Sequence, residues 1–225
     1  MSDQSRSTRR RRWVPWVITA LIVALLAASG YLVFSGLNPG SKYSAAEAKE
    51  PKIVLDDPPS QTEIDQMDPQ PASGDLRVPA VDMSTDLKTM NEVGGVINPP
   101  ELYPAFVING RATPKTPEDG TTIIALHSVQ GATLPGNKLI NVAAGTPAVS
   151  AGQEVIAQDR SFTIDKAYSV TKSDISDEED VWSDEPGKLV ILTCLQRTAG
   201  KSVENVIIIA HSNELIESDS STSSD

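Results

Sequence analysis

The chain is poor in the residues that build disulfides and metal sites. Its 225 residues include one cysteine and two histidines. A single cysteine has no partner in the same chain with which to form a disulfide. Zinc sites usually need a cluster of cysteine and histidine ligands, which this composition does not supply. We therefore expect neither an internal disulfide nor a metal or other cofactor.

The sequence also lacks the marks of nucleotide-binding and nucleic-acid-binding proteins. No glycine-rich phosphate-binding loop is evident, and the formal net charge is -11. Nucleic-acid binding depends on lysine and arginine side chains that neutralise phosphates, so a strongly acidic chain argues against it.

Positive charge is concentrated at the beginning of the chain. Residues 1–12 contain five arginines and one acid, and Trp13–Phe34 contains no charged residue. This uncharged run is long enough to cross the roughly 30 Å apolar core of a bilayer as a helix. We predict a single transmembrane signal anchor at residues 13–35, with residues 1–12 in the cytoplasm and the rest on the extracellular side. A signal peptide cleaved near residues 27–30 is the alternative.

The remainder of the chain divides by composition. Residues 36–75 are rich in Pro, Asp, Glu, Gln and Ser and cannot bury enough apolar surface to offset the entropy of ordering. We predict that they form an acidic, proline-rich extracellular spacer that holds the domain off the membrane. Residues 76–216 form the predicted folded domain, and residues 217–225 a disordered polar tail.

Short β-branched runs alternate with turn signals throughout the predicted domain. The runs are RVPAVDM, AFVING, TTIIAL, KLINVA, QEVIAQ, SFTIDKAYSV, KLVILT and NVIIIA, and segments such as PEDG, LPGN and EPGK separate them. This spacing is typical of an all-β barrel or sandwich, and no long helical period competes with it. One or two short helices could form at residues 86–93 or 175–181, where Ser or Asp can cap them.

The few reactive side chains follow predicted strands. His127, His211 and Cys194 each come directly after an apolar run, and Arg197 follows Cys194 by three positions. A nucleophilic thiol needs a nearby base or cation, and a guanidinium can stabilise the oxyanion that forms when a thiolate attacks a carbonyl. Each residue alone would more often be an ordinary core or surface residue. Together, His127, Cys194 and Arg197 are a minimal set for cysteine acyl transfer.

Several motifs resemble those of the sortases, the membrane-anchored cysteine transpeptidases of Gram-positive bacteria. ILTC, at residues 191–194, resembles the TLxTC-like motif that ends a strand at the active cysteine of that family. PEDGTTIIALHSVQG resembles the segment that leads into the catalytic-histidine strand, and RTAGKSVENVIIIA resembles the pattern after the cysteine in classes E and F. The resemblance covers about residues 76–210. It implies a sortase-like β-barrel preceded by a single transmembrane helix.

The resemblance also implies roles for particular residues. Cys194 would attack a backbone carbonyl in an LPxTG-type sorting signal of a secreted protein and form a thioacyl enzyme. His127 would protonate the departing amine and later deprotonate the incoming one. Arg197 would stabilise the oxyanion, with Arg160 as a fallback, and Thr193 would order the substrate or the arginine. The acceptor would be an amine of a cell-wall precursor or of a pilin.

Two other functions fit the same sequence. A noncatalytic, membrane-anchored β-domain of the cell envelope that binds wall polymer or protein would need no nucleophile. A cysteine hydrolase would use His127 and Cys194 in the same way but would transfer its acyl group to water.

Overall fold

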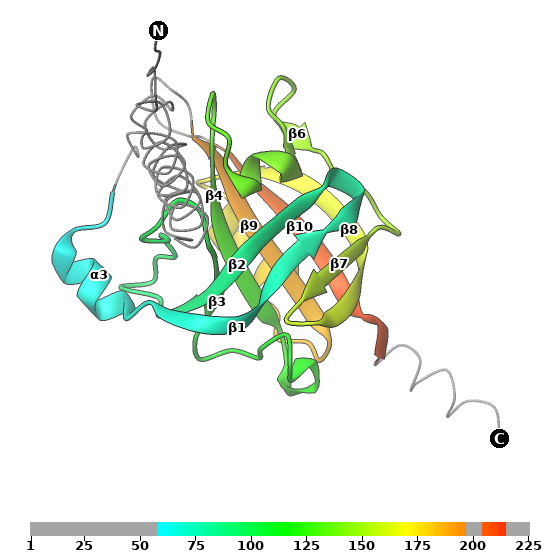
Figure 1. Ribbon diagram of the computed structural model, residues 1–225, viewed down its shortest axis with the longest axis horizontal. Helices are drawn as coiled ribbons and strands as arrows, with labels where there is room; N and C mark the ends of the chain where they lie inside the picture. Colours follow the sequence, from blue (N-terminus) through cyan, green and yellow to red (C-terminus); the bar gives the residue numbers. More distant parts are fainter. Residues whose placement is uncertain (1–57, 197–203, 215–225) are drawn as a thin grey trace, which may run out of the picture. The chain divides into compact units, whose positions relative to one another are not determined.

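The computed structural model describes residues 58–196 and 204–214, in which eight strands close into a barrel (Figure 1). The strands are β1 (Gln70–Val78), β2 (Met83–Met90), β3 (Ala105–Ile108), β4 (Thr122–Val129), β7 (Glu154–Ala157), β8 (Arg160–Thr171), β9 (Lys188–Gln196) and β10 (Glu204–Ser212). Their order around the barrel is β1, β2, β3, β4, β9, β10, β8, β7. The predicted all-β barrel is confirmed.

Two of the strand pairs are parallel. β3 lies parallel to β2, and β9 lies parallel to β4, whereas the other neighbours in the barrel are antiparallel. The short strands β5 (Ile140–Asn141) and β6 (Thr146–Pro147) form a separate two-stranded sheet. The β4–β9 pair matters most for function, because parallel neighbours bring their carboxyl ends to the same edge.

Strands β4, β9 and β10 are apolar on both faces because both faces are covered. One cluster of buried side chains receives residues from all eight strands, among them Ile124, Ile191 and Ile208, and so fills the barrel. A second cluster, which we call the outer cluster, lies on the opposite face and includes Ile123 and Val190. The continuous β-branched runs of the sequence are therefore explained by two-sided burial.

The outer cluster is covered in part by two short helices. Helix α3 (Gln61–Met67) contributes Met67, and α4 (Glu179–Trp182) contributes Val181. The α4 segment, with a preceding 3-10 turn at Ile175–Asp177, lies where the second short helix was expected. The other expected helix, at residues 86–93, is wrong. Most of that segment belongs to β2, which pairs with both β1 and β3, and this pairing on two sides outweighs local helix preference.

Two boundaries differ from the sequence-based prediction. RVPAVDM is a hairpin rather than one strand, because β1 ends at Val78 and Pro79–Val81 forms a 3-10 turn. Proline has no N–H to donate to a strand ladder. Residues 58–75, assigned above to the spacer, hold α3 and most of β1. The Ser60 side chain and the Glu63 side chain cap the start of α3 reciprocally, which is the S-x-x-E capping box.

The other predicted segments lie outside the described residues: the basic tail at 1–12, the anchor at 13–35, residues 36–57 of the spacer, and the tail at 217–225. Within the two described ranges, none of the helices combines the length and the hydropathy needed to cross a bilayer.

Candidate active site

The pairing of β4 with β9 sets His127 beside Cys194. The two residues are register partners in the parallel ladder, near the carboxyl ends of their strands. Directly paired residues on neighbouring strands project to the same face of a sheet, and successive residues alternate between faces. His127 and Cys194 alternate in step with Ala125 and Leu192, which belong to the outer cluster. Both side chains therefore lie on the outer face of the barrel wall.

A cavity of about 410 Å³ opens over this pair. Its floor includes His127 and Cys194, and its walls come from the connection between β2 and β3 and from the connection between β8 and β9. The wall residues include Ile97, Pro99, Lys172, Ile175, Trp182 and Leu192. This mixture of apolar side chains with a few polar groups is typical of a pocket that binds an organic ligand or a peptide side chain.

Trp182 is held firmly as one wall of the cavity. Its indole Nε1–H donates to the carbonyl oxygen of Ile175 over 2.6 Å, and the Arg111 guanidinium lies 5.7 Å from the centre of its ring. A cation over an aromatic face adds attraction to the packing of the ring. The short helix α4 thus presents a fixed aromatic surface to the cavity.

The imidazole of His127 is buried and bonded to the opposite wall. The residue is 3% exposed, and its Nε2 lies 2.7 Å from the carbonyl oxygen of Pro99. A carbonyl only accepts, so Nε2 carries the hydrogen and donates it. In the neutral imidazole this leaves Nδ1 as the nitrogen that can take a proton.

Burial makes His127 a neutral imidazole near pH 7. Desolvation is the main cause that lowers the pKa of His127 below its ordinary value of 6.5. The Pro99 hydrogen bond raises the pKa, and the positive charge of Lys172 lowers it further. The net direction is downward, so His127 is poised to act first as a base rather than as a standing imidazolium.

Ser128 fixes the end of β9 beneath the cysteine. Its hydroxyl donates to the carbonyl oxygen of Cys194 over 2.6 Å, and it accepts a hydrogen bond of 3.2 Å from the Thr193 hydroxyl. Thr193 also borders the cavity, yet it is 3% exposed and its hydroxyl is engaged with Ser128. Its side chain therefore orders the strand end, and a contact with substrate stays a prediction.

The turn after β4 holds the histidine from the other side. A 3-10 turn at Pro135–Leu139 packs so closely that a Cβ on Gly136 would lie 2.2 Å from the carbonyl oxygen of His127. The Asn137 side chain accepts from the backbone N–H of Val129 over 2.9 Å and donates to the Val129 carbonyl over 2.7 Å. Glycine is required at position 136 because any side chain would push β4 away from the turn.

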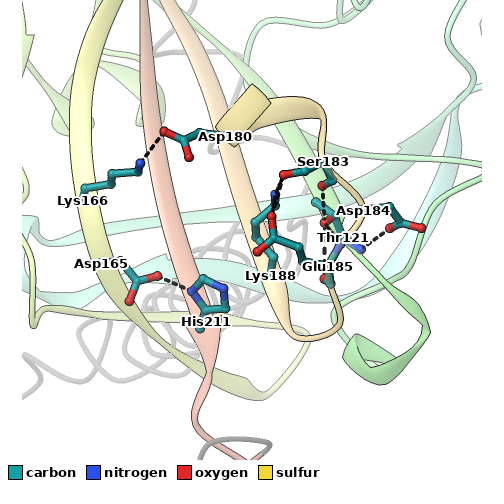
Figure 2. A network of polar contacts seen from close by, with 9 residues as sticks. All are labelled: Thr121, Asp165, Lys166, Asp180, Ser183, Asp184, Glu185, Lys188 and His211. Atoms are coloured by element: carbon teal, nitrogen blue, oxygen red, sulfur yellow. Dashed lines mark hydrogen bonds and ion pairs between the residues drawn. The ribbon is translucent and has the colours of Figure 1, made fainter. Parts of the chain in front are cut away.

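His211 lies at the opposite end of the same strands. It is the register partner of Lys188, at the start of β9, whereas Cys194 is near the end of β9. Figure 2 shows His211 bonded through Nδ1 to Asp165, beside the contacts of Lys188 with Ser183 and Glu185. We call these five side chains (Asp165, Ser183, Glu185, Lys188 and His211) the base network. Its member Lys188 lies six residues before Cys194 along β9. The structure therefore separates His211 from the cavity that holds His127.

Of the two candidate arginines, the structure describes Arg160 and does not place it at the cavity. Arg160, the fallback, stands at the start of β8 and pairs with Glu214, whereas the cavity is reached by the other end of β8. Arg197 lies outside the described residues, so its role stays a prediction.

Sequence reasoning missed several polar groups of the cavity, among them Pro99 through its carbonyl, Lys172 and Asn205. Asn205 carried a readable signal, because it alternates in step with Ile207 and Ile209 at the start of an apolar strand. The other two come from irregular connections, whose path follows from tertiary packing. No group of three or more potential metal ligands occurs within residues 58–196 and 204–214.

Solved structures with similarity to this chain include sortases A, C and D. Sortase A of Listeria monocytogenes is 13% identical with a TM-score of 0.45, and the match covers 64% of this chain and 88% of that one. Sortase A of Corynebacterium diphtheriae is 16% identical with a TM-score of 0.44, covering 76% and 79%. The Clostridium perfringens sortase D5 transpeptidase is 15% identical with a TM-score of 0.41, covering 61% and 76%.

No family model matches the sequence, and no curated protein matches it. At these identities the solved structures assign no residue role to this chain, so the chemistry depends on the cavity itself. The resemblance to classes E and F stays a prediction.

Proposed function

We propose that this protein is a sortase-type cysteine transpeptidase. The observation that carries the proposal is the juxtaposition of His127 and Cys194, from two parallel strands, in the floor of one cavity. A thiol next to a neutral imidazole is the arrangement that nucleophilic acyl transfer needs. An apolar wall beside it can hold a side chain of a peptide substrate while a backbone carbonyl lies over the sulfur.

The proposed reaction begins with proton transfer from Cys194 Sγ to His127 Nδ1. The thiolate attacks the carbonyl carbon of a peptide bond, and the resulting imidazolium then gives its proton to the departing amine. The lowered pKa of His127 favours this order, because a neutral imidazole is available to take the thiol proton at neutral pH. The product is a thioacyl enzyme, and an incoming amine releases the acyl group by the reverse proton movements.

The proposed substrates are secreted proteins that carry an LPxTG-type sorting signal. The acceptor is an amine of a cell-wall precursor or of a pilin, and Arg197 stabilises the oxyanion. The sequence motifs at Ile191–Cys194 and after the cysteine support this choice of substrate class, as does their similarity to classes E and F.

We also propose that the enzyme works at the outer surface of the cell membrane. The basic residues 1–12 and the uncharged run at 13–35 support a single-pass anchor with the barrel on the extracellular side. An anchored enzyme meets lipid-linked wall precursors and secreted proteins at high effective concentration. Residues 36–57 would extend the reach of the barrel from the membrane.

Product analysis with the full-length protein in detergent micelles tests the proposal. An LPxTG-containing peptide is incubated with the protein and a primary amine such as triglycine, and the products are identified by mass spectrometry. We expect a ligated product that requires Cys194 and is lost in Cys194→Ala.

Two outcomes would replace the proposal by the alternatives. Cleavage of the peptide without any ligated product, at every amine concentration, indicates a cysteine hydrolase. Neither cleavage nor ligation, in a protein that is shown to be folded, indicates a noncatalytic envelope domain.

A further inference from the structure

Cys194 has a second polar neighbour on the side away from His127. In the antiparallel ladder of β9 with β10, the register partner of Cys194 is Asn205. Strands β4, β9 and β10 are consecutive in the barrel (Figure 1). Their registers therefore set His127, Cys194 and Asn205 in one row across three strands. Neighbouring strands lie about 4.8 Å apart, which brings each side chain of the row within reach of the next.

The side chain of Asn205 lies on the same face as the thiol. Asn205 alternates in step with Ile207 and Ile209, which belong to the outer cluster, and it lines the same cavity as His127 and Cys194. The residue is half-buried, and its carboxamide makes no hydrogen bond to another side chain or backbone group in the described part of the chain. Its two N–H donors are thus available to a ligand in the cavity.

Attack by Cys194 creates a need for such a donor. When the thiolate adds to a carbonyl, negative charge develops on the carbonyl oxygen, and a fixed hydrogen-bond donor at that point lowers the barrier. The His127 Nε2–H is already directed at the Pro99 carbonyl. Lys172 also borders the cavity, but it comes from the connection after β8, whereas Asn205 is the direct register partner of Cys194. Among the described residues, Asn205 is the strand neighbour of Cys194, on the side away from His127, whose side chain can donate into the cavity.

We propose that the Asn205 carboxamide donates a hydrogen bond to the oxyanion that forms when Cys194 attacks an acyl group. This inference rests on the proposed function only where the acyl donor is a sorting peptide. The Sγ–C bond forms, the π electron pair of the carbonyl moves to its oxygen, and Asn205 Nδ2–H donates to that oxygen. The pair then returns, the carbonyl reforms and the C–N bond breaks. The amine leaves with the proton that His127 took from the thiol.

Two reagents that react with the same thiol separate this role from others. Acylation by p-nitrophenyl acetate passes through an oxyanion and releases p-nitrophenolate, which needs no proton from His127. Alkylation by iodoacetamide displaces iodide at a saturated carbon and forms no oxyanion. The ratio of the two second-order rate constants in the full-length protein therefore reports oxyanion stabilisation independently of thiolate formation and of access to the sulfur.

We expect Asn205→Ala to lower the acylation rate constant about 100-fold, the loss typical of one oxyanion donor, while the alkylation rate constant stays within twofold of the wild type. Asn205→Leu keeps the approximate size of the side chain but removes the donor without adding a charge beside the thiol, so it should lose as much. Asn213→Ala is the matched control, because Asn213 follows the other end of β10 and bonds Thr163 and Ser161 there. It should leave the ratio unchanged.

Three results would overturn the inference. One is an acylation rate constant within threefold of the wild type in both Asn205 variants. Another is a parallel loss of alkylation, which would assign Asn205 to thiol activation or positioning. The last is a wild-type thiol that iodoacetamide alkylates but the ester does not acylate. The ratio of the acylation rate constant to the alkylation rate constant could fall as expected in a protein that never cleaves an LPxTG peptide. The inference then stands, and the proposed substrate is wrong.

Discussion

The two ends of strands β9 and β10 use polar residues in opposite ways. At the cavity end, His127 is buried, no carboxylate of the described residues lines its cavity, and its pKa is lowered by burial. At the other end, the base network pairs each basic side chain with an acid: Lys188 with Glu185, and His211 with Asp165. Figure 2 shows these pairs near the start of β9 and the end of β10.

The comparison explains why one histidine is suited to chemistry and the other to structure. Asp165 satisfies a ring nitrogen of His211, and this contact joins β8 to β10. Burial of His127 disfavours its charged form, so the ring is neutral near pH 7 and releases readily to a leaving amine any proton that it takes from the thiol. The lesson is that the partner of each histidine, rather than its position after an apolar strand, separates the two roles.

The largest expected difference between the two ends is in catalysis. His127→Ala removes the base and should lower the rate of peptide ligation by roughly 10²–10⁴-fold. His211→Ala should keep most of the activity, because His211 lies six residues along β10 from Asn205, the register partner of Cys194. Initial rates measured at equal folded fraction, checked by thermal unfolding, test both. Equal losses in the two variants would erase the contrast between the two ends.

A tighter test of the cavity end is Gly136→Ala. The new Cβ would lie 2.2 Å from the His127 carbonyl oxygen and 3.3 Å from Thr193 Oγ1, so the turn and β4 must separate. We expect a loss of roughly 1–3 kcal/mol in unfolding free energy from overpacking, and a fall in ligation rate of about 10-fold or more from displacement of His127.

Gly110→Ala is the control for that substitution. A Cβ at Gly110 meets no atom within 4 Å, although the backbone φ of +82° is unfavourable for alanine. It should cost only about 1 kcal/mol of stability and leave the ligation rate unchanged. A Gly136 variant that behaves like the Gly110 variant would mean that the turn does not hold the histidine.

At the base network the expected effect is on stability alone. Lys188 is 2% exposed and donates to Ser183 and to Glu185, so Lys188→Ala removes a buried ammonium group that makes two hydrogen bonds. We expect a loss of roughly 1–3 kcal/mol in unfolding free energy, with an unchanged ligation rate. Lys166→Ala breaks the exposed pair with Asp180 and should cost under about 1 kcal/mol. Urea unfolding measures the loss of unfolding free energy in each lysine variant. Similar losses in Lys188→Ala and Lys166→Ala would contradict the difference in burial between the two lysines.

The pH dependence of stability should carry the signature of His127. Its pKa is lower in the folded protein than the 6.5 of an unperturbed histidine, so the unfolded chain binds more protons as the pH falls. This contribution to stability is complete above pH 6.5 and is lost as the pH falls through the folded pKa. Urea unfolding of wild type and His127→Gln between pH 8 and pH 5 isolates it. A difference that does not change with pH would contradict the lowered pKa.

The smallest expected effect is electrostatic. Lys172 lowers the pKa of His127 less than burial does, so Lys172→Met should raise that pKa slightly and leave the fold intact. An NMR titration of the His127 ring measures the shift, and Lys138→Met, near Asp82 and outside the cavity, should cause none. A downward shift in Lys172→Met would mean that the lysine does not face the imidazole.

The sequence predicts most of the strands, because β-branched runs such as those of β4, β9 and β10 have few alternatives when both faces are buried. It also predicts His127 and Cys194 as strand-end residues. The choice of His127 over His211, by contrast, depended on the sortase resemblance. The hairpin at Pro79 and the capping box at Ser60 were readable but were missed.

Other features could not be read from the sequence. Strand β2 pairs with β1 across a short turn and with β3 after an irregular connection, and local preference does not reveal this two-sided pairing. The row of His127, Cys194 and Asn205 depends on the register of three strands, which long-range packing sets. The bond from His127 to Pro99 joins a strand to an irregular connection 28 residues away.

The central claim is that Cys194 forms a thioacyl intermediate with a sorting peptide. The most direct measurement is the intact mass of the full-length protein, quenched in acid after incubation with an LPxTG peptide and no acceptor amine. We predict a mass increase equal to the acyl fragment of the peptide, mapped to Cys194 by proteolysis, absent in Cys194→Ala and strongly reduced in His127→Ala. A folded wild-type protein that cleaves or ligates the peptide without ever carrying this adduct, or that carries it on another residue, would contradict the claim.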